Sequence, residues 1–342
     1  STDVSWDDFA DAVKFLEEPR DRPFFLYQAY HSVHTPIQGR PDLTRQHRER
    51  AMRDGKSFNA QYAAMIESLD SGVGRIMDTL RKHDLADNTV VFFTSDNGGF
   101  AYSGGKKNNV TDNSPLRYGK GYCYEGGHRV PWIVHYPPLV KGGTVCHEPV
   151  ITTDLYPTIL NLAGVTSKPK QHRDGVDNTP LLRDPDATLT RDALFWHYPH
   201  RSPQGGTPSG AVRMGDWKLI EFFGDERREL YNLRNDLSER KDLALQMPEK
   251  TKELHDRLLA WRKEVHAKLT KSLPGFAKII ESELTESKLG FELASHANGL
   301  ALQKLEMPIT SQATLRLEIR PPAAFPSNGF LVFGTEPSDA AT

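Results

Sequence analysis

The sequence predicts an α/β protein whose main sheet is mostly parallel and sandwiched by helices. The first observation is a set of short apolar runs bounded by prolines or turn residues, at 24–27, 89–94 and 132–134. The second is a set of amphipathic helical patterns between and after these runs, at 6–18, 59–83 and 153–163. Strands buried on both faces read as continuous apolar runs, and their alternation with helices is typical of a parallel α/β sheet.

Each element of this sheet follows from a local pattern. Residues 59–83 carry one apolar stripe at helical spacing, formed by Tyr62, Met65, Ile66, Leu69, Val73, Ile76, Met77 and Leu80. The shorter patterns at 6–18 and 153–163 repeat at the same spacing. The strand predicted at 24–27 follows Pro23, and the strand predicted at 89–94 stops at Ser95.

A smaller α+β subdomain is predicted at 166–270, after this first domain at 1–165. Strand-like pieces at 193–196, 211–214 and 217–223 indicate an antiparallel sheet, with a hairpin turn at Gly215-Asp216. Residues 248–269 predict a covering helix, because Leu254, Leu258, Trp261 and Val265 share one face.

A linker and an accessory β module are predicted at 271–342. Thr314–Arg320 alternates strictly between apolar and polar residues, and Gly329–Gly334 reads as a second strand. No role follows from these strands alone.

Composition excludes several classes of function. The chain has 342 residues, a formal net charge of -2 and 26% charged residues, so no basic surface predicts nucleic-acid binding. No apolar run approaches the roughly 20 residues that a membrane span needs. Two cysteines, Cys123 and Cys146, are too few for a disulfide framework. Oligomeric state is not encoded in any of these features.

Polar residues follow the predicted strands at the edge where α/β sheets bind ligands. His34 lies beyond the strand at 24–27, and Asp96-Asn97 lies directly beyond the strand at 89–94. A carboxylate and an amide oxygen suit Ca²⁺, which takes six to eight oxygen ligands. His34 has the chemistry to protonate a leaving group near neutral pH. The alternatives are a simple Asp-Asn-Gly turn and a structural or surface histidine.

Lys120 lies between two glycines, and Arg129 follows a second glycine pair. An ammonium on such adaptable backbone suits a sulfate or phosphate oxygen, and an arginine suits a carboxylate. The alternative is a solvated, flexible loop. Cys123 has no sequence-local partner that would activate it, so a packing role is expected.

Together these segments resemble the sulfatase family of the alkaline-phosphatase superfamily. The matching motifs, in chain order, are F-F-L-Y-x-x-Y-H-x-x-H-T-P at 24–36, T-V-V-F-F-T-S-D-N-G-G at 89–99, P-L-R-x-G-K-G-x-x-Y-E-G-G-x-R-V-P at 115–131, D-L-Y-P-T-I-L-x-L-A-G at 154–164, A-V-R-x-G-D-W-K-L-I at 211–220 and E-L-Y-N-L at 229–233. The ordered set is far more specific than any one motif. It covers about residues 10–265.

The resemblance implies hydrolysis of a sulfate ester by a formylglycine nucleophile with Ca²⁺. It implies an alkaline-phosphatase-like fold, a sulfated carbohydrate or an aryl sulfate as substrate, and a periplasmic or secreted location. The implied roles are metal binding for Asp96 and Asn97, catalysis and sulfate contact for His34 and Lys120, and substrate binding for Arg129, His197 and Arg213.

The sequence departs from the family in one respect. The C-x-P-S-R or S-x-P-x-R nucleophile motif is absent. The resemblance also implies an Asp-Asp pair that completes the calcium shell and that, like the nucleophile motif, normally precedes the region matching residue 1. We therefore expect a fragment that is inactive alone. Two alternatives stay open: a phosphatase or phosphodiesterase of the same superfamily, and a glycan-binding pseudo-sulfatase. Asn97 favours calcium over the zinc of the former.

Overall fold

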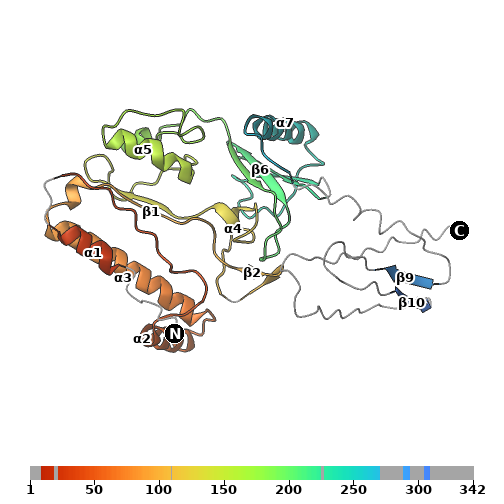
Figure 1. The fold of residues 1–342 in the computed structure, drawn as a ribbon, viewed down its shortest axis with the longest axis horizontal. Coiled ribbons are helices and arrows are strands. Elements are labelled where there is room, and N and C mark those ends of the chain that lie inside the picture. The colour runs from red at the N-terminus through yellow and green to blue at the C-terminus, as the bar shows by residue number, and fades with distance from the viewer. Residues whose placement is uncertain are drawn as a thin grey trace. The chain divides into compact units, whose positions relative to one another are not determined.

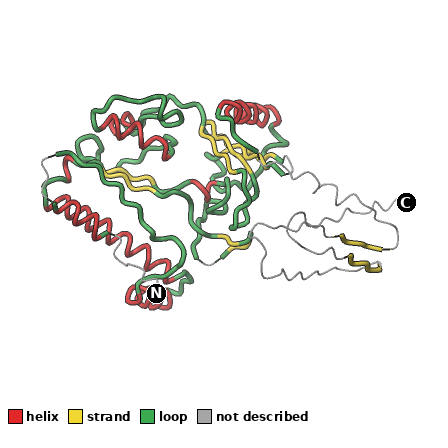
Figure 2. The backbone as a smooth tube through the Cα atoms, viewed as in Figure 1, coloured by secondary structure: helices red, strands yellow, loops and turns green. Residues whose placement is uncertain are grey.

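The computed structural model describes residues 9–18, 22–108, 110–224 and 227–269, together with the backbone pairing of 288–292 and 304–308. The chain divides into two compact units, residues 1–270 and 271–342. Figures 1 and 2 show the helices and strands of each unit. The comparison with the predicted elements therefore concerns mainly the first unit.

Three helices open the first unit: α1 (Ala10–Glu17), α2 (Pro41–Arg53) and α3 (Ala60–Lys82). α3 begins where Asn59 Oδ1 accepts hydrogen bonds from the Gln61 and Tyr62 amides, which are otherwise unpaired at a helix N-terminus. Both α1 and α2 pack against α3. The prediction of a long helix at 59–83 is confirmed, whereas α2 was not predicted.

The strands expected to form a parallel sheet pair differently. β1 (Val91–Thr94) and β4 (Trp132–His135) run antiparallel, with Phe92 opposite Val134. A parallel pair needs a long crossover, usually a helix. Here the connection carries the small hairpin of β2 (Tyr102–Ser103) and β3 (Lys106–Lys107), loops and one short helix. Every strand pair among the described residues is antiparallel, so the prediction of a mostly parallel sheet is wrong for these strands.

The apolar run at 24–27 is also not a strand, because no described strand pairs with it. Phe25 and Tyr27 are 69% and 81% exposed, so they do not form the buried strand that was predicted. The prediction of a buried strand at 24–27 is therefore wrong for the described part of the chain, although the run is apolar.

The first unit also contains a four-stranded antiparallel sheet, in the order β5 (Leu194–Tyr198), β6 (Ser209–Met214), β7 (Trp217–Phe222) and β8 (Arg228–Asn232). β6 and β7 are joined at Gly215-Asp216, and Gly215 has a φ of +56°, a conformation that glycine adopts without strain. The predicted antiparallel sheet and hairpin turn are confirmed.

The two faces of this sheet have different partners, because side chains alternate along a strand. One face packs on α7 (Pro248–Glu264), with Leu219, Leu254 and Leu258 fully buried between them. The opposite face carries Lys218, Ile220 and Phe222 and packs against the segment around Tyr124. The sheet therefore supports the chain that connects β1 to β4.

Two shorter helices, α5 (Leu155–Leu162) and α6 (Thr179–Arg183), lie between β4 and β5 along the chain. Asp154, just before α5, is fully buried and accepts bonds from the Arg191 guanidinium at 2.7 and 2.9 Å. This ion pair ties the start of α5 to the segment that enters β5.

The second unit contains β9 (Lys288–Glu292) paired antiparallel with β10 (Lys304–Pro308). The strands predicted at Thr314–Arg320 and Gly329–Gly334 lie outside the described residues. No helix in the described part of the chain has both the length and the apolar content to cross a bilayer.

Candidate functional site

The Asp96-Asn97 loop leaves the end of β1 and is fixed by its backbone. The Ser95 hydroxyl donates to the Asn97 carbonyl at 3.1 Å, and the Gly98 amide donates to the Gly127 carbonyl at 2.9 Å. A Cβ at Gly98 would lie 1.7 Å from the Gly126 carbonyl oxygen, so only glycine fits this approach. The Asp96 side chain is exposed.

The Lys120 loop is bonded directly to the Asp96 loop. The Lys120 amide donates to the Gly99 carbonyl at 3.1 Å. The Asn113 side-chain amide donates to the carbonyls of Gly99 (3.0 Å) and Tyr118 (2.9 Å). The predicted metal-binding loop and the predicted anion-binding lysine are thus held together by three hydrogen bonds.

Lys120 itself is half-buried, and its ammonium has no hydrogen bond or ion pair with any of the described residues. A lysine that is partly desolvated and unpaired attracts an anion. This environment is compatible with the predicted contact to a sulfate oxygen.

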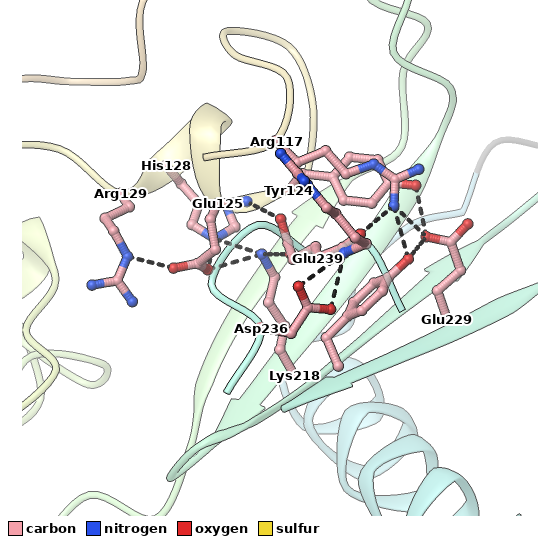
Figure 3. Close-up of polar contacts among 11 residues, drawn as sticks. Arg117, Tyr124, Glu125, His128, Arg129, Lys218, Glu229, Asp236 and Glu239 are labelled. Carbon is pink, nitrogen blue, oxygen red and sulfur yellow. Dashed lines mark hydrogen bonds and ion pairs between the residues drawn. The ribbon is translucent and has the colours of Figure 1, made fainter. Parts of the chain in front are cut away.

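A buried ion network follows Lys120 along the chain (Figure 3). It is centred on α4, the single turn Glu125–His128. Lys218 from β7 lies 3.0 Å from Glu125 Oε1 and 2.8 Å from Glu239 Oε1. All three side chains are at most 2% exposed. Buried charges of this kind are stable only when they are paired.

The charges of the network are distributed unevenly. Burial alone would raise the pKa of Glu125, but Lys218, His128 and Arg129 outweigh it, and the pKa is lowered far below its usual range. Burial raises the pKa of Glu239, with Lys218 opposing the shift. Burial and the Lys218 charge lower the pKa of His128 to about 4, so its ring is neutral near pH 7.

Arg129 contributes to this network rather than standing free. Its Nε donates to Glu125 Oε2 at 2.6 Å, and its side chain is 40% exposed. Because Nε is used for the carboxylate, its terminal nitrogens are the groups left for other contacts (Figure 3). Its predicted role in substrate binding stays a prediction.

The two residues predicted from the smaller subdomain lie on opposite faces of its sheet. Arg213 is opposite Lys218 in the β6–β7 register, on the face that meets α4. His197 is opposite Gly210 in the β5–β6 register. Gly210 lies three positions from Arg213 along β6, and because side chains alternate between the two faces of a sheet, His197 lies on the face that packs on α7. There its Nε2 donates to the Lys268 carbonyl at 2.8 Å. The structure does not bring these two side chains together.

His34 is exposed, and its ring contacts its own neighbours. Nδ1 lies 3.0 Å from the Thr35 carbonyl, and the ring meets His31 edge-on at 5.8 Å. No bond or ring contact among the described residues joins it to Asp96 or Lys120. Its predicted part in the site stays a prediction.

The described residues fit a calcium ion only in part. Asp96 and Asn97 offer oxygen ligands of the right kind, and the Asp96 carboxylate has no ion pair in the described structure. No group of three or more His, Cys, Asp or Glu side chains in the described residues could hold a metal. These two residues would therefore supply a minority of a calcium shell.

Cys123 is buried beside a cavity of about 240 Å³ that Tyr118, Tyr122 and Phe222 also line. Burial raises the pKa of its thiol, which keeps it protonated and unreactive. This environment agrees with the packing role expected from the sequence.

Sequence reasoning missed Lys218 and Glu239. Lys218 lies within the motif A-V-R-x-G-D-W-K-L-I, but a lysine next to Trp217 and Leu219 reads as an exposed strand position. One signal could have revealed its burial. In a strand, Lys218 and Ile220 lie on one face and Leu219 on the other, so Lys218 shares a face with an apolar residue.

Comparison with known proteins identifies the class. Residues 3–165 match the family model Sulfatase, and residues 117–264 match the model N-sulphoglucosamine sulphohydrolase, C-terminal. The predicted resemblance is confirmed, and the chain belongs to the sulfatase family. A protein of Formosa agariphila named Sulfatase is 36% identical over 263 residues, which are 70% of this chain and 46% of that protein.

Solved structures agree. The crystal structure of Ps i-CgsB superposes with a TM-score of 0.65 at 30% identity, covering 74% of this chain and 53% of that one. The same protein has been solved in complex with k-i-k-neocarrahexaose. Another structure, in complex with its substrate D-glucosamine-2-N,6-O-disulfate, has a TM-score of 0.50 at 25% identity and covers 63% and 45%. This chain thus spans about half the length of the relatives it matches.

Proposed function

We propose that this chain forms the metal- and sulfate-binding part of a sulfuric ester hydrolase that acts on a sulfated carbohydrate. The observation that carries the proposal is the hydrogen-bonded pair of loops. It fixes the backbone of Lys120, whose ammonium has no ion pair among the described residues, relative to the loop that carries Asp96 and Asn97. A cation site and a lysine side by side suit the charged oxygens of a sulfate ester.

In this proposal Lys120 binds a sulfate oxygen, and His34 contacts the sulfate and protonates the leaving oxygen. Asp96 and Asn97 would hold Ca²⁺ with further ligands from outside the described residues. Bound there, the ion would supply Lewis-acid stabilisation of the sulfuryl oxygens. The formylglycine nucleophile would also lie outside this chain, because the sequence contains no C-x-P-S-R motif.

A carbohydrate substrate is supported by two relatives. One structural neighbour binds k-i-k-neocarrahexaose, and another has D-glucosamine-2-N,6-O-disulfate as its substrate. An aryl sulfate is the second candidate within the same chemistry. The periplasmic or secreted location stays a prediction.

The test is binding of D-glucosamine-2-N,6-O-disulfate to the 342-residue chain by calorimetry, with unsulfated D-glucosamine as the matched ligand. We expect Lys120→Ala to weaken binding about tenfold or more, since a hydrogen bond to a charged group contributes about 1.5–3 kcal/mol. Lys106→Ala, an exposed lysine on β3, should leave it unchanged. Equal affinity for the sulfated and unsulfated sugars would refute the proposal.

Two further measurements address calcium and the nucleophile. Asp96→Ala should abolish any calcium dependence of binding that a chelator reveals in the parent chain. Hydrolysis of 4-nitrophenyl sulfate should not be detectable with the 342-residue chain alone, and its detection would place a nucleophile inside the chain. Preference for a phosphorylated sugar over the sulfated one would instead favour the phosphatase alternative.

A further inference from the structure

We propose that Lys218 is a positioning residue for both halves of the site. By holding Glu125 and Glu239, it fixes α4, and through α4 it fixes the loops that carry Asp96-Asn97 and Lys120. The identity of the ligand at these loops rests on the proposed function, whereas the positioning of the loops by Lys218 does not. No role was assigned to Lys218, Glu125 or Glu239 from the sequence.

The Lys218 ammonium lies among three polar groups of the network: Glu125 Oε1 at 3.0 Å, His128 Nε2 at 3.1 Å and Glu239 Oε1 at 2.8 Å. His128 Nε2 also lies 3.2 Å from Glu125 Oε1, so the tautomer of the neutral ring sets which of the two contacts is a hydrogen bond. A fully buried lysine with no exposed atom has no direct access to a ligand, so its effect must pass through these partners.

Glu239 holds the Lys120 segment at both ends. Its Oε2 accepts the Glu125 amide at 2.7 Å, and its backbone carbonyl accepts Arg117 Nη1 at 2.7 Å. Arg117 and Glu125 lie on either side of Lys120 in the sequence. The turn that presents Glu239 is closed by Asp236, whose carboxylate accepts the backbone amides of the two residues after Glu239 (Figure 3).

The path from α4 to the site is short and tightly packed. Gly127, inside α4, accepts the Gly98 amide, which follows Asn97 directly. A Cβ at Gly126 would lie 2.4 Å from the Arg117 and Tyr118 carbonyls, so the turn sits against the Lys120 segment without a gap. A displacement of α4 must therefore move both loops.

Removing the ammonium creates a specific imbalance. Without Lys218, the Glu125 and Glu239 carboxylates share a buried site, and Glu125 keeps the ion pair with Arg129 and the weaker attraction of the Arg213 charge. Unpaired buried carboxylates repel and draw in water or protons. Because Glu125 belongs to α4, its movement toward solvent would loosen the site loops selectively.

The experiment measures amide hydrogen exchange in the 342-residue chain carrying Lys218→Met. The reporters are the amide of Gly98, which donates to Gly127 in α4, and the amide of Lys120, which donates to Gly99 in the Asp96 loop. The matched control is Leu258→Ala, which damages the opposite face of the same sheet. At equal global stability, set by added urea, we expect exchange at these amides about tenfold faster in Lys218→Met than in the control, equivalent to about 1.4 kcal/mol of local opening.

Charge removal supplies the second readout. Lys218→Met/Glu239→Gln removes one of the two buried carboxylates, so it should recover slow exchange at Gly98 and Lys120 in part, although it carries one more substitution. If Lys218→Met does not fold, Glu239→Gln alone is measured against Leu258→Ala and should loosen the same amides. Equal exchange in the test and control variants, or no recovery in the double variant, would overturn the positioning role.

The exchange result separates this inference from the proposed function. Selective loosening with no sulfated-sugar binding by the parent chain would support positioning and refute the function. Sulfated-sugar binding that Lys218→Met leaves unchanged, with exchange equal to the control, would refute positioning and support the function.

Discussion

The buried histidine of the ion network should make the stability of the first unit depend on pH. The His128 side chain is 15% exposed, stacks on Trp196 at 4.2 Å and points Nε2 at the Lys218 ammonium. Burial and Lys218 lower its pKa from 6.5 to about 4. Glu125, Glu239 and Arg129 complete its charged surroundings. The perturbation is His128→Gln, which keeps an acceptor near Lys218 but does not titrate.

The sign follows from proton uptake. Between pH 6.5 and about 4 the unfolded chain binds a proton at His128 and the folded chain does not, so stability falls as pH falls through this window. A pKa lowered from 6.5 to about 4 corresponds to a contribution of about 3 kcal/mol at the acid end. In His128→Gln this contribution is absent, while Glu125 and Glu239 titrate in both proteins.

The assay is urea unfolding followed by tryptophan fluorescence at half-unit steps from pH 4 to 7.5. We expect the difference in unfolding free energy between His128→Gln and the parent to change by up to about 3 kcal/mol across the window, in favour of the variant at low pH. His147→Gln, an exposed control, should follow the parent curve. A difference that stays constant between pH 4 and 7 would contradict the burial of a neutral His128.

Three further predictions use urea unfolding and exchange. Arg191→Met should cost about 3–5 kcal/mol, because it leaves the fully buried Asp154 carboxylate without its partner; a loss below 1 kcal/mol would mean that the pair is solvated. Leu258→Ala should cost about 2–5 kcal/mol through the cavity it opens under the sheet, and an unchanged urea midpoint would refute its burial. Gly126→Ala should accelerate amide exchange at Gly98, since its Cβ would meet two carbonyls at 2.4 Å; unchanged exchange would show that the turn can shift freely.

Local patterns predicted the parts of the fold that local physics determines. The stripe at 59–83 gave α3 within one residue at each end, because a long amphipathic helix with an asparagine cap is encoded in its own sequence. Gly215-Asp216 gave the β6–β7 hairpin for the same reason, since a two-residue turn fixes the register of its strands.

Strand partners could not be predicted in this way. The apolar runs at 89–94 and 132–134 do form β1 and β4, but apolarity does not encode direction, and these strands pair antiparallel. The prediction for the run at 24–27 failed for the same reason. Apolar residues form a strand only where a neighbouring segment offers backbone groups to pair with. Pairing is a property of the surrounding chain.

The sequence predicted which residues form the candidate site, but not the hydrogen bonds that hold their loops together. Asp96 and Lys120 were singled out separately, but their loops are linked by backbone groups of Gly98, Gly99 and Gly127 and by the Asn113 side-chain amide, none of which predicted the link from the sequence. The glycines were recognised as adaptable backbone. The structure shows that these positions need glycine because a Cβ atom would collide with the neighbouring loop. The requirement is therefore the absence of a side chain, and not backbone flexibility.

The contrast between Lys120 and Lys218 is the strongest electrostatic argument for the site. Both lysines lie in motifs that resemble those of sulfatases, but the sequence predicted a role for Lys120 alone. Lys218 is fully buried, and its charge is cancelled by Glu125 and Glu239. Lys120 is half-buried and has no ion-pair partner in the described structure, so its positive charge is available to attract a ligand bound at the two loops. The paired lysine therefore has a structural use, and the unpaired one is left for the anion.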